Sequence, residues 1–244
     1  MRHLNWQSIE AGHTKVASAI LAPMGLISLL FSDPLVFAIV AVVLVAAITI
    51  HEFAHAWMAD YLGDPTPRSQ DRVTLDPRAH LDPIGTVMLL FIGFGWGKPV
   101  MFDPYNLKDP KKDAALIALA GPASNLILAL LMAILLPIIA TLVPAIAGIT
   151  LHVLGLLLFF NVMLALFNLV PVYPLDGSKI LLALLPEDFS YEYQKVMQQY
   201  GQLILIALLI PWNGASPISQ LISPPMQFLV SLYQLLAATV LSLI

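Results

Sequence analysis

The residues that could do chemistry are concentrated in an H-E-F-A-H motif, in which His51 and His55 flank Glu52. The motif follows the apolar run 35–50, so we expect it to lie on a helix. On a helix, residues i and i+4 share one face, and the two imidazoles can reach a single zinc ion. The glutamate between them can then act as general base on a water at that ion. Ionisable side chains in an apolar segment are costly, which favours a functional role.

A catalytic zinc site needs a third protein ligand and one open position for water. Asp176 is the preferred candidate, because two prolines end an apolar segment just before it and can turn its carboxylate to the depth of the histidines. His80 and Asp82 are further candidates, but the surrounding turn chemistry favours a capping or hydrogen-bonding role for them. His152 begins an apolar segment on the opposite side, where an interfacial position is expected.

Three asparagines lie within apolar sequence, where an amide is expensive unless it is paired. For Asn161 we expect a hydrogen bond between helices. Asn168 lies two turns before Asp176, so its amide could hold the substrate backbone or donate to the oxyanion. For Asn125 the sequence leaves a substrate or oxyanion role and a packing role equally open. Gly121, four residues before Asn125, allows two helices to approach closely.

The composition indicates a membrane protein. The chain has 244 residues, of which 59% are hydrophobic and 11% are charged, whereas soluble domains carry about 25% charge. The mean hydropathy is +0.86, and several apolar runs approach the roughly 20 residues that a membrane span needs. These values exclude an ordinary soluble globular domain. The absence of cysteine excludes disulfides, thiolate ligands and cysteine-protease chemistry.

We therefore predict an all-α polytopic membrane protein, a single transmembrane domain over residues 1–244 with about six transmembrane helices. Between the second and third spans, Ile84–Phe94 is apolar but too short to cross. Near it, Arg72–Leu75 and Pro99–Phe102 are predicted to be short strands of a membrane-associated β-hairpin region that could pair with an unwound substrate. The expected core spans are 35–59, 114–136 and 151–172, and the expected peripheral spans are 16–31, 196–210 and 226–244.

The basic residues predict the orientation. With six spans, the loops 1–15, 60–113 and 173–195 contain all 11 Lys and Arg, and the opposite loops contain none. This asymmetry predicts a multi-pass protein of the cell membrane with both termini in the cytoplasm. His51 then lies roughly 24 Å into a hydrocarbon core of about 30 Å, near the cytoplasmic face.

Several motifs together resemble the site-2 protease family of intramembrane zinc metalloproteases, peptidase family M50. The resemblance covers roughly residues 35–185, and its motifs occur in order, each at the expected place relative to a span. The segments that carry it are H-E-F-A-H at 51–55, R-V-T-L-D-P-R-A-H-L-D-P-I-G at 72–85, G-W-G-K-P-V at 95–100, G-P-A-S-N at 121–125, and N-L-V-P at 168–171 continuing to P-L-D-G at 174–177.

The resemblance implies that His51, His55 and Asp176 bind one zinc ion per chain and that Glu52 is the catalytic base. Asn168 matches the asparagine that the family places near its active site. The implied partners are single-span membrane protein substrates and the lipid bilayer, and no nucleic-acid partner is expected. Many members carry an inserted PDZ domain or a C-terminal CBS pair; neither is evident in the sequence, which predicts a minimal form.

Two other classes of function fit some of these residues. A divalent-metal transporter would also place His and Asp within the membrane, but transport favours several weak sites along a path, whereas the polar residues here cluster near one face. An inactive metal-bound scaffold would not need the intact Glu52.

Overall fold

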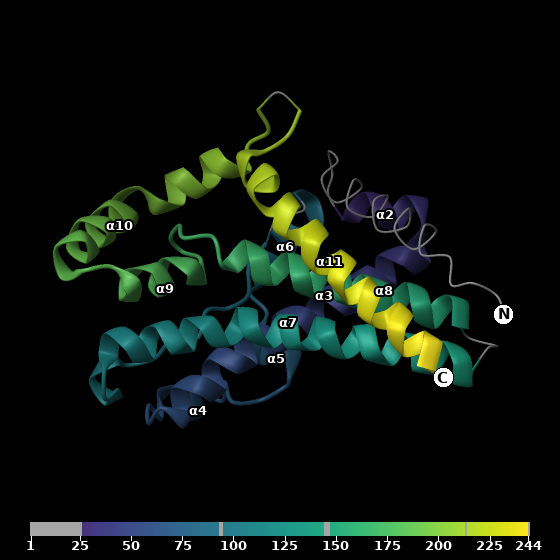
Figure 1. Cartoon of the computed structure of the whole chain (residues 1–244). Coiled ribbons are helices and arrows are strands. Elements are labelled where there is room, and N and C mark those ends of the chain that lie inside the picture. The colour runs from purple at the N-terminus through teal and green to yellow at the C-terminus, as the bar shows by residue number, and fades with distance from the viewer. Residues whose placement is uncertain (1–25, 93–94, 144–146, 213, 244) are drawn as a thin grey trace.

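The structure, a computed structural model, describes residues 26–92, 95–143, 147–212 and 214–243, and these residues fold mainly into helices joined by loops (Figure 1). The elements in chain order are α2 (Ile27–Ser32), α3 (Pro34–Tyr61), α4 (Thr66–Ser69), α5 (Pro77–His80), α6 (Pro83–Ile92), the 3-10 helix η1 (Pro104–Asn106), α7 (Pro110–Leu142), α8 (Ala147–Asn168), α9 (Asp176–Leu184), α10 (Glu187–Leu209) and α11 (Pro217–Leu243).

Three helices in the described part of the chain, α3, α7 and α11, are long and apolar enough to cross a membrane. They have 28, 33 and 27 residues, or roughly 40 to 50 Å at 1.5 Å per residue. They contain the expected second, third and sixth spans, apart from Ile244, which lies outside the described residues. The all-α prediction is therefore confirmed.

The other three predicted spans are not confirmed. The described apolar part of α8, Gly155–Asn168, is shorter than a full crossing. The expected span 196–210 falls in the second half of α10, whose first turn carries Glu187 and Asp188. Most of the expected span 16–31 lies outside the described residues. The count of six spans therefore stays a prediction.

The predicted β-hairpin region is not found among the described residues. Segments 72–75 and 99–102 contain no strand, and the β-pairing present consists of isolated bridges, one of which joins Leu81 to Gly97. The cause is local chemistry. Prolines remove ladder donors from this region, and aspartate side chains bond to nearby backbone N–H groups that a ladder would need.

Asp-Pro pairs start most of the helices and turns. In each pair the proline takes one of the first helical positions, or the position just before them, and the aspartate accepts a hydrogen bond from a backbone N–H two or three residues later. Asp33 in this way caps α3 through the N–H of Val36, and Asp109 caps α7 through that of Lys112. The same arrangement occurs at Asp64, Asp76, Asp82 and Asp103.

Helices α3, α7 and α8 pack together, and α11 lies across α7 and α8 (Figure 1). Several small residues of α3 and α7, two helices that pack together, are fully buried: Ala47, Ala56 and Ala59 of α3 and Ala118 of α7. Side chains this small let two backbones approach closely. One apolar cluster joins α2, α3 and α8, and another joins α7, α8 and α11.

The chain leaves α8 at Asn168 and forms a loop that leads to Asp176, the first residue of α9. Helix α10 supports this loop, because Tyr193 Oη donates to the carbonyl of Pro171 and Gly201 packs against Tyr173. Buried apolar residues of the loop, α10 and α11 form a further cluster. The position of Asp176 is thus set by packing between α8 and the C-terminal helices.

Candidate metal centre

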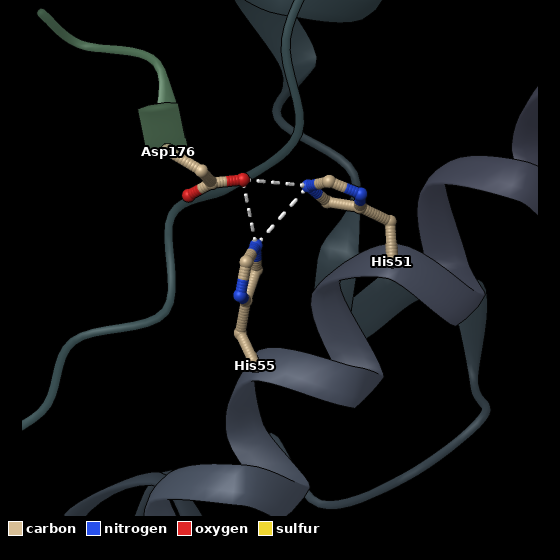
Figure 2. A group of neighbouring side chains, drawn as sticks. All are labelled: His51, His55 and Asp176. Carbon is tan, nitrogen blue, oxygen red and sulfur yellow. Dashed lines mark hydrogen bonds and ion pairs between the residues drawn. The ribbon is translucent and has the colours of Figure 1, made fainter. Parts of the chain in front are cut away.

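His51, His55 and Asp176 meet at one point, although Asp176 is far from the histidines in sequence (Figure 2). The Nε2 atoms of the two histidines are 3.1 Å apart. Each of these nitrogens lies 3.2 Å from Oδ2 of Asp176. All three side chains are buried. Among the described residues, this is the group of histidine and acidic side chains that could hold a metal ion.

The other ring nitrogens of the histidines fix the tautomers. Nδ1 of His51 lies 2.6 Å from Oδ1 of Asn125, and Nδ1 of His55 lies 2.7 Å from the carbonyl oxygen of Ile117. Both partners are oxygen acceptors, so both Nδ1 atoms must carry the hydrogen. In the neutral form of each ring, Nε2 then carries the lone pair, so the two lone pairs point at each other and at a carboxylate, an arrangement that a cation stabilises.

The amide of Asn125 is oriented by further buried contacts. Its Nδ2 donates to Oδ1 of Asn161 at 2.7 Å and to the carbonyl of Ala47 at 3.2 Å. Asn161 in turn donates from Nδ2 to the carbonyl of Leu157 at 2.7 Å. Both asparagines are fully buried. We call the path from Leu157 through Asn161 and Asn125 to His51 the amide chain; it joins α8, α7 and α3.

The distances fit a tetrahedral zinc ion. Zinc binds nitrogen and oxygen ligands at about 2.0–2.2 Å, and in a tetrahedron the ligands are then roughly 3.3 to 3.6 Å apart. The separations of 3.1 and 3.2 Å are close to this range. Oδ2 of Asp176 is also buried without a hydrogen-bond partner among the described residues, which a metal bond would satisfy. Three protein ligands leave one position for water.

Gly121 of α7 makes room for the imidazoles. A Cβ atom at this position would lie 2.4 Å from Nε2 of His55 and 2.7 Å from Cε1 of His51. Any side chain here would therefore displace both rings. The sequence suggested that Gly121 serves helix approach, and the structure shows that the space it leaves is filled by the histidine pair.

Glu52 is half-buried on the neighbouring face of α3. Its Oε2 lies 4.0 Å from Nη2 of Arg72, and its carboxylate lies next to the backbone of Gly97. The glutamate is thus approached by loop residues, whereas the metal-ligand group lies between helices.

The remaining sequence candidates lie outside the ligand group. His80 is buried and donates from Nε2 to the carbonyl of Thr74, and Asp82 accepts from the N–H of Gly85 at the start of α6. Both have the hydrogen-bonding roles that the sequence favoured. His152 lies on α8, but its side chain falls outside the described residues.

The two asparagines proposed for substrate contact differ. Both amide hydrogens of Asn125 and its carbonyl oxygen are engaged, so the contacts disagree with an oxyanion role and give it that of an orienting partner for His51. Asn161 makes the expected contact between helices. Asn168 donates to the carbonyl of Leu164 within α8, and its predicted contact with substrate or oxyanion stays a prediction.

Sequence reasoning missed the link from Asn125 to His51 and the approach of Arg72 to Glu52. The available signal for the first was the position of Asn125, one helical turn after Gly121 in the motif at 121–125. For Arg72 the sequence offered a charged residue in a loop, which in itself does not indicate burial.

A histidine pair of the H-E-x-x-H pattern that converges with a carboxylate defines a metallopeptidase type of centre, and here both histidines lie on a helix long and apolar enough to cross a membrane. The sequence profile of peptidase family M50 matches residues 39–210, and the chain belongs to this family.

Relatives support this assignment. YwhC of Bacillus subtilis, provisionally named a zinc metalloprotease, is 32% identical over 178 residues, covering 71% of this chain and 81% of YwhC. Rip2 of Mycobacterium tuberculosis, also provisionally named a zinc metalloprotease, is 30% identical over 188 residues, covering 73% of this chain and 69% of Rip2. Rip2 of Mycolicibacterium smegmatis is 28% identical over 184 residues, covering 72% and 68%. No solved structure gives a significant match.

Proposed function

We propose that the protein is a zinc-dependent intramembrane endopeptidase that hydrolyses peptide bonds in or near transmembrane segments of other membrane proteins. The observation that carries this proposal is the convergence of His51, His55 and Asp176, whose ligand atoms lie 3.1 to 3.2 Å apart. Both histidines and Glu52 belong to α3, a helix long and apolar enough to cross a membrane. A hydrolytic centre on such a helix suits substrates that are themselves in the bilayer.

The roles of the residues follow from their chemistry. One zinc ion per chain, held by the three ligands, supplies a Lewis acid for water and for the scissile carbonyl. Glu52 accepts the proton of the attacking water and later returns it to the leaving amine. One amide hydrogen of Asn168 is engaged with Leu164, and we assign the other to the substrate backbone or the oxyanion. The buried surroundings limit the water that competes for these contacts.

The proposed substrates are single-span membrane proteins. A transmembrane helix hides its carbonyls in hydrogen bonds, so the substrate must unwind near the cut, which small or helix-breaking residues make easier. We place both termini in the cytoplasm and the active site near the cytoplasmic face, because all 11 Lys and Arg fall in one set of predicted loops.

The proposal is tested by incubating the purified chain with a single-span substrate, with and without a zinc chelator. We expect cleavage that chelation stops and added zinc restores. Glu52→Gln should abolish cleavage and still bind one zinc per chain, because the substitution keeps all three ligands. Retained proteolysis in that variant would rule out Glu52 as the base.

The same preparation separates the other two classes of function. Reconstituted in vesicles, a transporter would move zinc across the bilayer without cutting the substrate. A scaffold would bind zinc and substrate and do neither. Mass spectrometry of peptides trapped by the Glu52→Gln variant in cells would identify the substrates.

A further inference from the structure

Arg72 is a buried cation in a loop. It lies between α4 and α5, yet it is only 3% exposed. Burial lowers the pKa of its guanidinium below the ordinary value, and the charge of Glu52 opposes this shift. Arginine is seldom buried to this extent unless it is paired. We therefore expect Arg72 to be held by specific partners.

The guanidinium of Arg72 bridges two parts of the molecule. Nη1 donates to the carbonyl of Pro99 at 2.9 Å, and Nη2 donates to the carbonyl of Lys98 in a short hydrogen bond. The same Nη2 lies 4.0 Å from Oε2 of Glu52. One rigid, planar group thus donates to two successive backbone carbonyls and also lies near the carboxylate of Glu52.

The backbone segment whose carbonyls accept from Arg72 also lies against Glu52 at Gly97. A Cβ atom at Gly97 would lie 2.9 Å from Oε1 of Glu52 and 3.1 Å from Cγ2 of Ile48. The contact therefore has no space for a side chain, and a small shift of the backbone changes the space available to the carboxylate.

The segment Gly97–Pro99 is held on a second side as well. The N–H of Lys98 donates to the carbonyl of His80 at 2.7 Å, and Gly97 forms an isolated bridge with Leu81. Arg72 supplies the side-chain contacts that complete this attachment.

We propose that Arg72 is a positioning residue for Glu52: its guanidinium fixes the segment Gly97–Pro99 against the glutamate and holds the carboxylate in one orientation. A general base must be aligned with the proton that it takes, and a misplacement of about 1 Å can cost roughly 100-fold in rate. The kinetic consequence rests on the proposed function, whereas the structural consequence does not.

Replacing Arg72 by lysine or by glutamine separates the effect of its charge from the effect of its two carbonyl contacts. Arg72→Lys keeps a positive charge but loses the fork that grips two carbonyls, and Arg72→Gln loses both the charge and the fork. The matched controls are Arg78→Lys and Arg78→Gln. Arg78 belongs to the same region and is paired with Asp76 at the surface.

The first readout is amide hydrogen exchange of peptides covering residues 95–103, measured on the full chain in detergent or nanodiscs. We expect at least tenfold faster exchange in both Arg72 variants and no change in the Arg78 variants. The second readout is cleavage of the single-span substrate. We expect kcat to fall about 100-fold for Arg72→Gln and about 10-fold for Arg72→Lys, with KM and zinc affinity within twofold of wild type.

Unchanged exchange in both Arg72 variants, or a kcat within twofold of wild type in both, would overturn the proposal. So would a zinc affinity that falls in step with kcat, because Arg72 would then act through the metal centre. If Arg72→Gln fails to fold, the proposal is tested with Arg72→Lys and Gly97→Ala. Gly97→Ala leaves Arg72 in place but puts a methyl group against Glu52, and it should also lower kcat. A wild-type chain that binds zinc but cleaves no substrate rejects the proposed function, and hydrogen exchange alone then decides whether Arg72 holds the segment.

Discussion

The metal-ligand group and the surroundings of Glu52 adjoin each other but are built differently. The histidines are oriented from inside the helix bundle, by the amide chain and by a backbone carbonyl of α7. Glu52 is contacted from a loop, by Arg72 and by the backbone of Gly97. We therefore expect metal affinity and the alignment of the base to depend on separate parts of the chain and to respond to different substitutions.

A similar contrast exists within the ligand pair. The support of His51 is a side chain, Asn125, which can be replaced. The support of His55 is the carbonyl of Ile117, which every residue at that position supplies. Substitutions that remove a supporting side chain should therefore affect the orientation of His51 more than that of His55.

The largest expected effect on zinc comes from Asp176→Asn. The variant keeps the shape of the side chain but removes the charge of a buried ligand. We expect zinc affinity to fall about 100- to 1,000-fold, which corresponds to ~3–4 kcal/mol. Glu52→Gln is the control and should bind zinc like wild type. Competition with a metal-binding dye measures both, and an equal loss in the two variants would contradict the separation of the two regions.

Gly121→Ala should have the next largest effect. The added methyl group would overlap Nε2 of His55 and Cε1 of His51, so both rings must turn away from Asp176. We expect zinc affinity to fall on the order of 100-fold, at the upper end of what changes around the ligands cost. The same dye competition measures it, and a matched substitution, Ala129→Gly elsewhere in α7, should leave affinity unchanged. Wild-type affinity in Gly121→Ala would show that the rings do not need this space.

The amide chain should contribute a smaller amount. Asn125→Leu removes the acceptor of the His51 Nδ1 hydrogen, and we expect zinc affinity to fall about 10- to 100-fold. Asn161→Leu acts one hydrogen bond further away and should cost less, about 3- to 10-fold. Thr49→Val is the control, because the buried hydroxyl of Thr49 has no hydrogen-bond partner among the described residues. An effect of Asn161→Leu as large as that of Asn125→Leu would indicate a general loss of packing.

The smallest effect on zinc is expected from Asp64→Asn in the loop region. Burial raises the pKa of Asp64, but hydrogen bonds from Thr66, Asn106 and the N–H of Asp103 lower it by a larger amount. The pKa of Asp64 therefore lies below its ordinary value. The folded state therefore favours the carboxylate. Its contribution to stability is present above the unfolded pKa of about 3.9 and is lost as the pH falls through the lower folded value.

Asp64→Asn should lower the free energy of unfolding by about 1–3 kcal/mol, because the amide keeps only one of the two acceptor oxygens and at least one donor then lacks its partner. Zinc affinity should stay within twofold of wild type. Thermal unfolding measures the first quantity at pH 7, where the contribution is present, and at about pH 3, where part of it is lost; dye competition at pH 7 measures the second. A large loss of zinc affinity would show that the loop and the metal centre are coupled.

The sequence was sufficient for the parts of the site that depend on spacing within a helix or on a recurring motif. His51 and His55 are one turn apart on any helix, and Asp176 was placed by the prolines before it. The contacts made by Asn125 could not be predicted from the sequence, because they depend on how α3, α7 and α8 are rotated against each other. The same holds for Gly121, whose role requires the ring positions of another helix.

The fold was predicted least well between α3 and α7. Arg72–Leu75 was predicted to be a short strand, but Asp76 and Asp82 accept hydrogen bonds from nearby N–H groups and start helices instead. Arg72 then turns inward to the carbonyls of Lys98 and Pro99. A charged side chain in a polar loop normally faces water, so the composition of this loop did not indicate that Arg72 is buried.

The ligands of the centre come from two distant stretches of the chain, α3 and the start of α9. An ion bound between them closes a long covalent loop that includes all of α7 and α8, and it does so only in the folded chain. Binding free energy therefore adds directly to folding free energy. Zinc supply would then influence how long this protein resists degradation by the cell, in addition to whether its active centre is complete.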